Sequence, residues 1–303
     1  MAKKRPKRVR IRIAGPDKKG IIATVTQFVF QAGGNIEDID QRNLEGYLVM
    51  NMLVDLSDYR ASLQKFCQAL AGVAQKIGME SSVKEESSRE KKNLAILVTK
   101  ESHCLQDILK QIKAGKINAE IKMVVGNQPG LESFIKKYSL PFRYIPSEKK
   151  KWHEEEILKL LQPLDIDLIV LARYMQILSP EFVFRYEGKI INIHPSLLPA
   201  FPGPRSYEQA YNKGVDFAGV TAHFVTTDLD EGPIICQEAF RLRRGKEDPI
   251  SIQERGRKLE TKALTQAVKW FCDDQLVLRR GRVIFSKHEH AMTEITRQFY
   301  QFP

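Results

Sequence analysis

The sequence predicts an α/β protein of two domains, and three observations support this. The chain has 303 residues, about twice the roughly 150 expected of one domain. Strand and helix patterns follow one order up to residue 85, and from residue 93 short apolar runs alternate with amphipathic stretches. The polar stretch SSVKEESSREKK separates the two regions and has the composition of a linker. We therefore expect one domain at 8–85, a linker at 86–92, a second domain at 93–286 and a polar C-terminal tail at 287–303.

The first domain is expected to have the element order βαββαβ. Val9, Ile11 and Ile13 alternate with arginines, which is the period of a half-buried strand. Turn residues at Gly15–Pro16–Asp17 end this strand, and an apolar helical stretch follows. The remaining elements are a helix at 21–32, strands at 36–43 and 47–55, a helix at 63–77 and a strand at 79–84. This order is the ferredoxin-like, split βαβ arrangement.

This first domain resembles an ACT domain, a small amino-acid-sensing module. The resemblance rests on Gly15–Pro16–Asp17, Gly20–Ile21 and Gly34–Asn35–Ile36. In that family the first loop and the start of the following helix hold an effector between copies, and free N–H groups at a helix start suit a carboxylate. The resemblance implies a homo-oligomer and an amino-acid effector, glycine or methionine, bound by Asp17, Gly20, Asn35 and Ile36. The alternative is that the glycines only form turns.

The second domain is expected to be a doubly wound, mostly parallel sheet. Apolar runs that predict strands lie at 94–98, 121–125, 143–146, 168–171 and 190–194. Helical patterns between them lie at 105–114, 131–138, 152–161 and 180–186. Such alternation places helices on both faces of a parallel sheet. Runs at 218–225 and 234–242 leave no room for a helix between them, so we expect them to be antiparallel, followed by a helix at 252–271 and a strand at 282–285.

Two polar residues stand at the end of the apolar run IINIH. Asn192 and His194 are two positions apart, so both side chains point to the same face of the strand. Ligands of α/β proteins bind outside the carboxyl ends of the strands, which favours a functional site. The alternative is a hydrogen-bonded core asparagine beside a satisfied histidine.

A second polar block, HFVTTDLDEGPII at 223–235, crowds three carboxylates into one loop. Mutual repulsion is expected to raise the pKa of any of them that is buried. One of them could pair with His194 as an orienting or proton-relay partner. The alternative is a solvated acidic loop.

Together the two blocks resemble the folate-dependent formyltransferase and formyl-hydrolase superfamily. The resemblance rests on Asn192-x-His194-Pro195-Ser196-x-Leu198-Pro199 together with Asp230, and it covers about residues 93–285. It implies a Rossmann-type domain in which Asn192, His194 and Asp230 are catalytic. The segment at 171–180 resembles the family's folate pocket, and the loop at 225–230 resembles the one whose backbone holds the pterin ring. The substrate-binding residues implied are Met175, Ile177, Leu178, Val225, Thr226 and Asp228.

The chemistry of formyl transfer suggests a role for each catalytic residue. Attack on the formyl carbon places negative charge on oxygen, and an amide such as that of Asn192 stabilises an oxyanion by ~3 kcal/mol in comparable sites. His194 can hydrogen-bond the oxyanion or deliver a proton to the departing nitrogen. Asp230 can position a water or the imidazole. Either His194 or Asp230 could be the general base.

The acceptor of the formyl group is indicated by the loop after the domain's first strand. Glycinamide ribonucleotide transferases have a Gly/Ser/Asn-rich loop there that cradles a phosphate. Here the segment 99–105, TKESHCL, has no glycine, and Glu101 would repel a phosphate. This resembles the formyltetrahydrofolate deformylases, whose nucleophile is water, as do the ACT-like domain and Gln176. Pro195–Ser196–Leu197 is the exception, because it is closer to the transferase pattern.

We therefore expect hydrolysis of 10-formyltetrahydrofolate to formate and tetrahydrofolate, with the formate feeding purine synthesis. The first alternative is a glycinamide ribonucleotide, or other amine, formyltransferase. The second is a non-enzymatic regulator that binds folate or an amino acid.

Composition and charge limit the classes of partner, compartment and cofactor that we expect. The net charge of +11 owes part of its value to the basic arm at residues 3–8, but no nucleic-acid fold signature accompanies that arm, so nucleic-acid binding is not expected. No apolar run approaches the ~20 residues of a membrane span. Four scattered cysteines suggest reduced thiols in the cytoplasm. The six histidines form no metal-binding pattern, so we expect neither a metal nor a cofactor, folate being the substrate.

Overall fold

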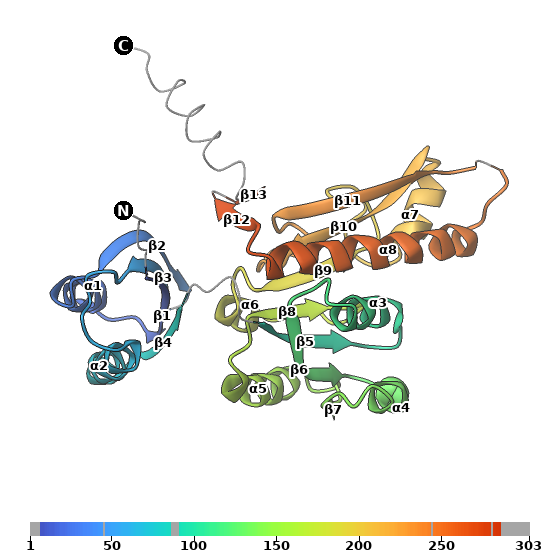
Figure 1. Ribbon diagram of the computed structural model, residues 1–303. Helices are drawn as coiled ribbons and strands as arrows, with labels where there is room; N and C mark the ends of the chain where they lie inside the picture. The colour runs from blue at the N-terminus through green and yellow to red at the C-terminus, as the bar shows by residue number, and fades with distance from the viewer. Residues whose placement is uncertain (1–6, 45, 86–90, 244, 280, 286–303) are drawn as a thin grey trace, which may run out of the picture. The chain divides into compact units, whose positions relative to one another are not determined.

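The computed structural model describes residues 7–44, 46–85, 91–243, 245–279 and 281–285 (Figure 1). The chain divides into two compact units, 1–89 and 90–303. Most of the basic arm, residues 86–90 of the expected linker and the expected tail at 287–303 lie outside the described residues. Among the described residues, no helix combines the length and apolar character that crossing a membrane requires.

The first unit has the predicted ferredoxin-like order. Its elements are β1 (Arg8–Pro16), α1 (Ile21–Gln31), β2 (Asn35–Leu44), β3 (Tyr47–Asp55), α2 (Leu63–Lys76) and β4 (Glu80–Glu85). The strands form an antiparallel sheet in the order β2-β3-β1-β4. Alternate residues of β1, among them Val9, Ile11 and Ile13, are buried in a core shared with Val25 of α1 and Phe66 of α2. Period two in the strand thus produces the face on which both helices pack.

The second unit contains a seven-stranded sheet. Its strands are β5 (Lys92–Val98), β6 (Ala119–Gly126), β7 (Phe142–Tyr144), β8 (Leu168–Leu171), β9 (Ile190–His194), β10 (Phe217–Phe224) and β11 (Ile234–Arg241). They are arranged in the order β11-β10-β9-β8-β5-β6-β7. The strands from β5 to β9 are parallel to their neighbours, whereas β10 is antiparallel to both β9 and β11. The predicted α/β class and the antiparallel pair are confirmed.

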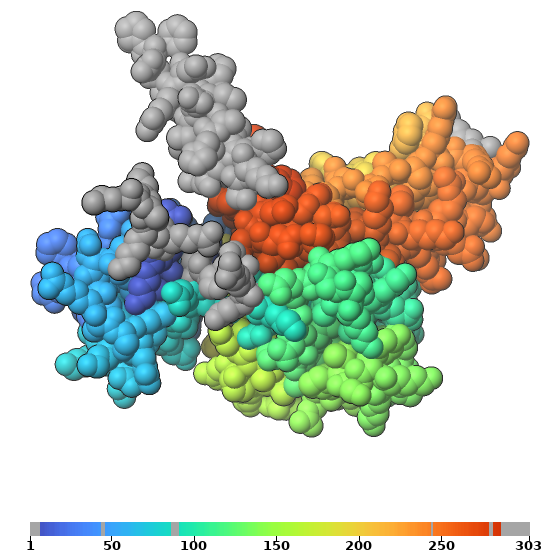
Figure 2. All heavy atoms as spheres, in the orientation of Figure 1, coloured from blue at the N-terminus to red at the C-terminus, as the bar shows by residue number. Residues whose placement is uncertain are grey.

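Helices cover both faces of this sheet. The helices are α3 (His103–Lys113), η1 (Pro129–Leu131), α4 (Glu132–Lys136), α5 (Lys150–Leu161), η2 (Gln162–Leu164), α6 (Pro180–Arg185), α7 (Ser206–Lys213) and α8 (Pro249–Cys272). Leu94, Ile96 and Val98 of β5 face α3 and α8, while Ala95 and Leu97 face α5 and α6 (Figure 1). In the space-filling view, the surface of β10, β11 and α8, coloured orange to red, extends beyond the green and yellow part of the same unit (Figure 2). The continuously apolar central strands are therefore buried on both sides.

The main differences from the sequence-based expectation lie in the second unit. Helix α7 and strand β12 (Leu276–Arg279), which pairs with β13 (Arg282–Phe285), were not predicted. Helix α7 has two turns and buries only Ser206, Tyr207 and Ala210, too few positions to show a helical period. The helix expected at 131–138 is divided into η1 and α4. Helix α8 begins three residues earlier than predicted, because Asp248 caps it by accepting from the Ser251 N–H and Pro249 occupies the first turn.

The order of the strands reverses beside β5. Strand β5 is the first strand of this sheet along the chain. Strands β6 and β7 lie on one side of it, and the chain then crosses to β8 and β9 on the other. The carboxyl ends of β5 and β8 therefore flank the position where doubly wound sheets bind ligands.

Candidate active site

Strand β9 presents Asn192 and His194 at its carboxyl end. Across the antiparallel pair with β10, Asn192 is opposite His223 and His194 is opposite Thr221. The two β9 side chains share a face because they are two positions apart. His194 is buried, whereas Asn192 is half-buried and accessible from the strand end.

The structure brings Asp230 to His194. Asp230 Oδ2 lies 3.3 Å from His194 Nδ1, and the two side chains are only 7% and 6% exposed. The same carboxylate oxygen accepts the Gly203 N–H at 2.9 Å. Asp230 has a φ of +58°, in the left-handed region that aspartate tolerates better than most residues. A tight loop backbone therefore aims this carboxylate at the imidazole.

The acidic loop corrects one expectation. Repulsion among its carboxylates was expected to raise the pKa of a buried member, but the pKa of Asp230 is lowered. Burial works to raise that pKa, and the hydrogen bonds from His194 and the Gly203 N–H outweigh burial. Asp228 and Glu231 are exposed, so water screens their repulsion.

The second nitrogen of His194 is also engaged. His194 Nε2 lies 3.0 Å from the Phe201 carbonyl oxygen and 3.2 Å from Ser206 Oγ. The Ser206 hydroxyl donates to the Gly203 carbonyl oxygen, so it presents a lone pair to the imidazole. The loop that follows β9 and the start of α7 therefore fix the ring from the side opposite Asp230.

Asn192 is oriented by His223, a residue that the sequence analysis did not assign to the site. His223 Nδ1 lies 2.9 Å from the Phe224 carbonyl oxygen, which accepts only, so Nδ1 carries the proton. Burial lowers the pKa of His223, which keeps its ring neutral. Its Nε2 is then the acceptor for the Asn192 amide, 3.3 Å away. One N–H of Asn192 is held there, which fixes the direction of the other.

The segment expected to form the folate pocket connects β8 to α6 and is fastened at both ends. The Met175 N–H donates to Thr99 Oγ1 at 2.9 Å, and the Ser179 N–H donates to Glu154 Oε1 at 2.8 Å. Between these anchors Met175 and Ile177 are 54% and 60% exposed, whereas Leu178 is buried. The segment thus presents two large apolar side chains to solvent from a fixed backbone.

The loop after β10 lies against the same core. Val225 is half-buried and packs on the cluster that contains Leu178, and its N–H donates to the Ile190 carbonyl oxygen at 2.9 Å. Thr226 Oγ1 donates to the Asp228 carbonyl oxygen, and the Asp228 side chain is exposed. The two expected folate segments therefore share one apolar cluster, and the Val225 hydrogen bond places this loop beside the first residue of β9.

The four expected effector residues do not meet within one chain. Asp17 and Gly20 lie beyond the carboxyl end of β1, where Pro16 pairs with Tyr47. Asn35 and Ile36 begin β2 at the opposite end of the sheet, where Asn35 pairs with Asp55. Strand β3 spans the two ends with nine residues, about 30 Å at the usual rise. A single site made from both pairs would need two copies of the chain.

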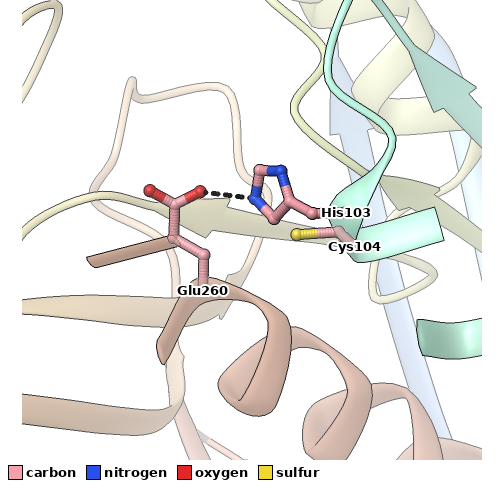
Figure 3. A group of neighbouring side chains, drawn as sticks. All are labelled: His103, Cys104 and Glu260. Atoms are coloured by element: carbon pink, nitrogen blue, oxygen red, sulfur yellow. Dashed lines mark hydrogen bonds and ion pairs between the residues drawn. The ribbon is translucent and has the colours of Figure 1, made fainter. Parts of the chain in front are cut away.

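A second polar cluster lies after β5 and β8, and we call it the Arg173 cluster: Glu101, His103, Arg173, Tyr207 and Glu260. In Figure 3, His103 from the start of α3 faces Glu260 on α8, with Nε2 and Oε2 3.1 Å apart, and the Cys104 thiol lies beside them. Within the described part of the chain, His103, Cys104 and Glu260 form a group whose ligand atoms lie within 4.8 Å of one another, as metal ligands do.

The donor set of this group fits a charge network better than a metal site. Glu260 Oε1 accepts the Tyr207 hydroxyl at 2.8 Å, and Glu260 Oε2 lies 3.4 Å from Arg173 Nε. A metal ion bound by Glu260 would stand beside this permanent guanidinium charge. Burial raises the pKa of the Cys104 thiol far above neutral. The cation that these carboxylates hold is thus the chain's own arginine.

Comparison with known proteins agrees with this fold and site. Residues 92–268 match the Formyl transferase family and residues 7–84 match the ACT domain family. The chain is therefore an enzyme of the formyltransferase fold joined to an ACT domain. It is 37% identical to the formyltetrahydrofolate deformylase of Bacillus subtilis over 91% of this chain and 92% of that one. The chain belongs to the formyltetrahydrofolate deformylase family.

Two solved structures show how far the likeness extends. A formyltetrahydrofolate deformylase from Pseudomonas syringae superposes with a TM-score of 0.64 at 29% identity, covering 94% of this chain and 96% of that one. Glycinamide ribonucleotide transformylase 1 from Symbiobacterium toebii superposes with a TM-score of 0.62, also at 29% identity. The superposition covers 96% of the transformylase chain but only 66% of this chain. The transformylase thus shares the fold over part of this chain, whereas the deformylase shares nearly all of it.

Proposed function

We propose that the protein hydrolyses 10-formyltetrahydrofolate to formate and tetrahydrofolate. The observation that carries this proposal is the convergence of Asn192, His194 and Asp230 at the end of β9, beside two segments suited to the folate. Membership of the deformylase family and the whole-length likeness to deformylases support the same reaction. The formate would supply purine synthesis.

The geometry supports a division of roles. Water attacks the formyl carbon, its oxygen forms the new C–O bond, and the carbonyl oxygen becomes an oxyanion that accepts the free N–H of Asn192. Asp230 takes the proton that water loses. The C–N10 bond then breaks as His194 delivers a proton to N10, which releases tetrahydrofolate and formate.

The hydrogen-bond partners of His194 favour it as the proton donor. Nδ1 faces the Asp230 carboxylate, and Nε2 faces the Phe201 carbonyl oxygen and Ser206 Oγ. All of these groups accept hydrogen bonds, so each ring nitrogen has an acceptor for a proton that it carries. We therefore assign delivery of the proton to His194 and acceptance of the proton of water to Asp230.

Formate release without an amine acceptor tests the proposal. Purified protein supplied with 10-formyltetrahydrofolate alone should produce formate and tetrahydrofolate in equal amounts. Formate or formyl transfer that appears only after glycinamide ribonucleotide is added would establish the transferase alternative. Folate binding with neither product would establish the non-enzymatic regulator.

We infer that the first unit binds an amino-acid effector between copies of the chain. The support is its ACT fold and the separation of Asp17 and Gly20 from Asn35 and Ile36, which two copies could bring together. Glycine or methionine should then change the rate of formate release, and Asp17→Asn should abolish the change. A rate that responds to neither amino acid, in a protein shown to be an oligomer, would count against this.

We further propose that the reaction needs no metal or other cofactor. The reacting groups are an amide, an imidazole and a carboxylate, which suffice for acid–base hydrolysis. Dialysis against a chelator should leave formate release unchanged. Free cysteines at 67, 104, 236 and 272 fit a reducing compartment such as the cytoplasm.

A further inference from the structure

The position where this sheet reverses its strand order is filled by the chain's own charged side chains. Glu101 follows β5 by three residues, and Arg173 follows β8 by two. These are the carboxyl ends between which doubly wound sheets place a ligand. Arg173 Nε lies 3.4 Å from Glu101 Oε2 and 3.4 Å from Glu260 Oε2. The Arg173 side chain is 10% exposed and that of Glu260 is 1% exposed, so the crevice is occupied.

The backbone at Arg173 is the second observation. Its φ of +62° lies in the left-handed region, which favours glycine and strains other residues. Strain of this kind persists where the surrounding structure holds it for a purpose. Here the strained backbone directs the guanidinium between two carboxylates.

The rest of the Arg173 cluster fastens this arrangement and connects it to the catalytic residues. His103 lies between the two carboxylates: its Nε2 hydrogen-bonds Glu260 Oε2 at 3.1 Å, and its Nδ1 lies 3.4 Å from Glu101 Oε2. Tyr207 donates to Glu260, and the preceding residue of α7, Ser206, contacts His194. The first two residues of α7 thus touch both sites, which makes the two sites neighbours.

We propose that Arg173, held by Glu101 and Glu260, closes this crevice against a second, phosphate-bearing substrate and so leaves water as the nucleophile. The inference rests on the proposed hydrolysis and names the residues that determine its specificity. An acceptor entering the crevice would have to separate the guanidinium from both carboxylates and leave the buried Glu260 without the arginine that balances its charge. Its phosphate would also approach the Glu101 carboxylate. Both effects discriminate against the acceptor and leave a water molecule unaffected.

The similarity to the transformylase indicates that a few side chains at the site determine which acceptor is used. A protein named for glycinamide ribonucleotide shares this fold at 29% identity with a TM-score of 0.62. Because one fold serves both families, the difference in acceptor has to come from particular side chains at the site. The crevice next to His194 is where such side chains would act.

The double variant Arg173→Gly/Glu101→Ala tests the proposal. Glycine suits the backbone at position 173, and loss of Glu101 removes the carboxylate nearest solvent, so the crevice opens while Arg257 and Lys100 remain beside it. Formate release and N-formylation of glycinamide ribonucleotide are measured in the same sample, with and without acceptor. In the wild type, adding the acceptor should change the rate of formate release by less than about twofold. In the double variant, the acceptor should lower the rate of formate release by at least about fivefold, and formylated acceptor should appear.

Three further measurements complete the test. Lys262→Ala removes an exposed ion pair on the same helix as Glu260 and should behave as the wild type does. Inorganic phosphate should inhibit the double variant and not the wild type. If the double variant does not fold, Glu101→Ala alone, at a side chain 26% exposed, should show the same phosphate sensitivity to a smaller degree.

Two outcomes overturn the inference. One is a folded opened variant that releases formate and responds neither to acceptor nor to phosphate. The other is a wild-type protein that already formylates the acceptor. Failure of the proposed hydrolysis itself is recognised separately, because the wild type would then release no formate in the absence of acceptor.

Discussion

Asn192 and His223 face each other across β9 and β10, with the amide nitrogen 3.3 Å from imidazole Nε2. The Phe224 carbonyl oxygen takes the proton of the other ring nitrogen, so the imidazole can only accept from the amide. An amide whose rotation is fixed in this way presents its remaining N–H in one direction. If Asn192 is the oxyanion donor, as proposed, it is oriented before substrate arrives, which is the condition for electrostatic stabilisation of a transition state.

Replacing His223 should reduce turnover through Asn192. We expect His223→Ala to lower kcat by about tenfold with little change in KM, and Asn192→Ala to lower it by about a hundredfold or more, as loss of an oxyanion donor does. The kcat of the double variant should be close to that of Asn192→Ala alone, because His223 acts through the Asn192 amide. If the losses of kcat in the two single variants multiply in the double variant, His223 does not act through Asn192. Steady-state kinetics of the wild type, the two single variants and the double variant measures these values of kcat.

His223 should also make stability depend on pH. Burial lowers its pKa in the folded state, whereas the unfolded chain has the ordinary value of about 6.5. Below about pH 6.5 the unfolded state takes up the proton first, so stability falls as the solution becomes more acidic, until the folded-state pKa is reached. His223→Gln should make this fall less steep in thermal unfolding curves. His153, whose pKa is also lowered by burial, remains in the variant and accounts for a residual slope. Equal slopes in both proteins would show that His223 does not contribute.

Asp230→Asn should abolish most turnover while preserving the fold. The amide keeps an oxygen for the Gly203 N–H but has no charge to hold the His194 ring or to accept a proton. We expect kcat to fall by at least about a hundredfold, within the usual range for a general acid–base group. Glu231→Gln, on the same loop but exposed, is the matched control and should retain activity. Retained turnover in Asp230→Asn would remove Asp230 from the mechanism.

The sequence predicted what depends on local pattern and missed what depends on contacts between distant segments. The apolar runs of β8, β9 and β13 have the predicted bounds, because each run is short and bounded by turn residues. Asn192, His194 and Asp230 were predicted together because a family motif joins them, and the structure places Asp230 against His194. His223 was missed, although it stands in the block that was singled out, because its place opposite Asn192 depends on the register of β9 with β10.

The same limit applies to Arg173 and to the pKa of Asp230. The φ of +62° at Arg173 has no signal in the sequence, because arginine rarely adopts the left-handed region. The lowered pKa of Asp230 depends on Gly203, twenty-seven positions earlier in the chain. The carboxylates of the loop, read from the sequence alone, indicate only their mutual repulsion, which would raise the pKa.

The expected folate segment should depend on Glu154 for its shape. Glu154→Ala would leave the Ser179 N–H without its acceptor, which costs about 1–3 kcal/mol for a buried donor, and the segment carrying Met175 and Ile177 should loosen. We expect KM for the folate to rise several-fold with a smaller effect on kcat. Glu154→Gln keeps an amide oxygen in place and should be close to the wild type. A loss of kcat with unchanged KM would contradict a role in holding the segment.

Gly232 should be required for the position of Asp230. A Cβ at residue 232 would lie 1.7 Å from the Phe224 carbonyl oxygen, and that oxygen also holds His223. Gly232→Ala therefore has to displace either the Asp230 loop or the end of β10, and both carry contacts of the proposed catalytic residues. We expect it to lower kcat by more than about tenfold, because misplacement of reacting groups by about 1 Å is costly. Gly130→Ala is the control, since a Cβ there meets nothing within 4 Å. Full activity of Gly232→Ala would mean that a Cβ fits beside the Phe224 carbonyl oxygen. That result would contradict the position of the loop that places Asp230 against His194.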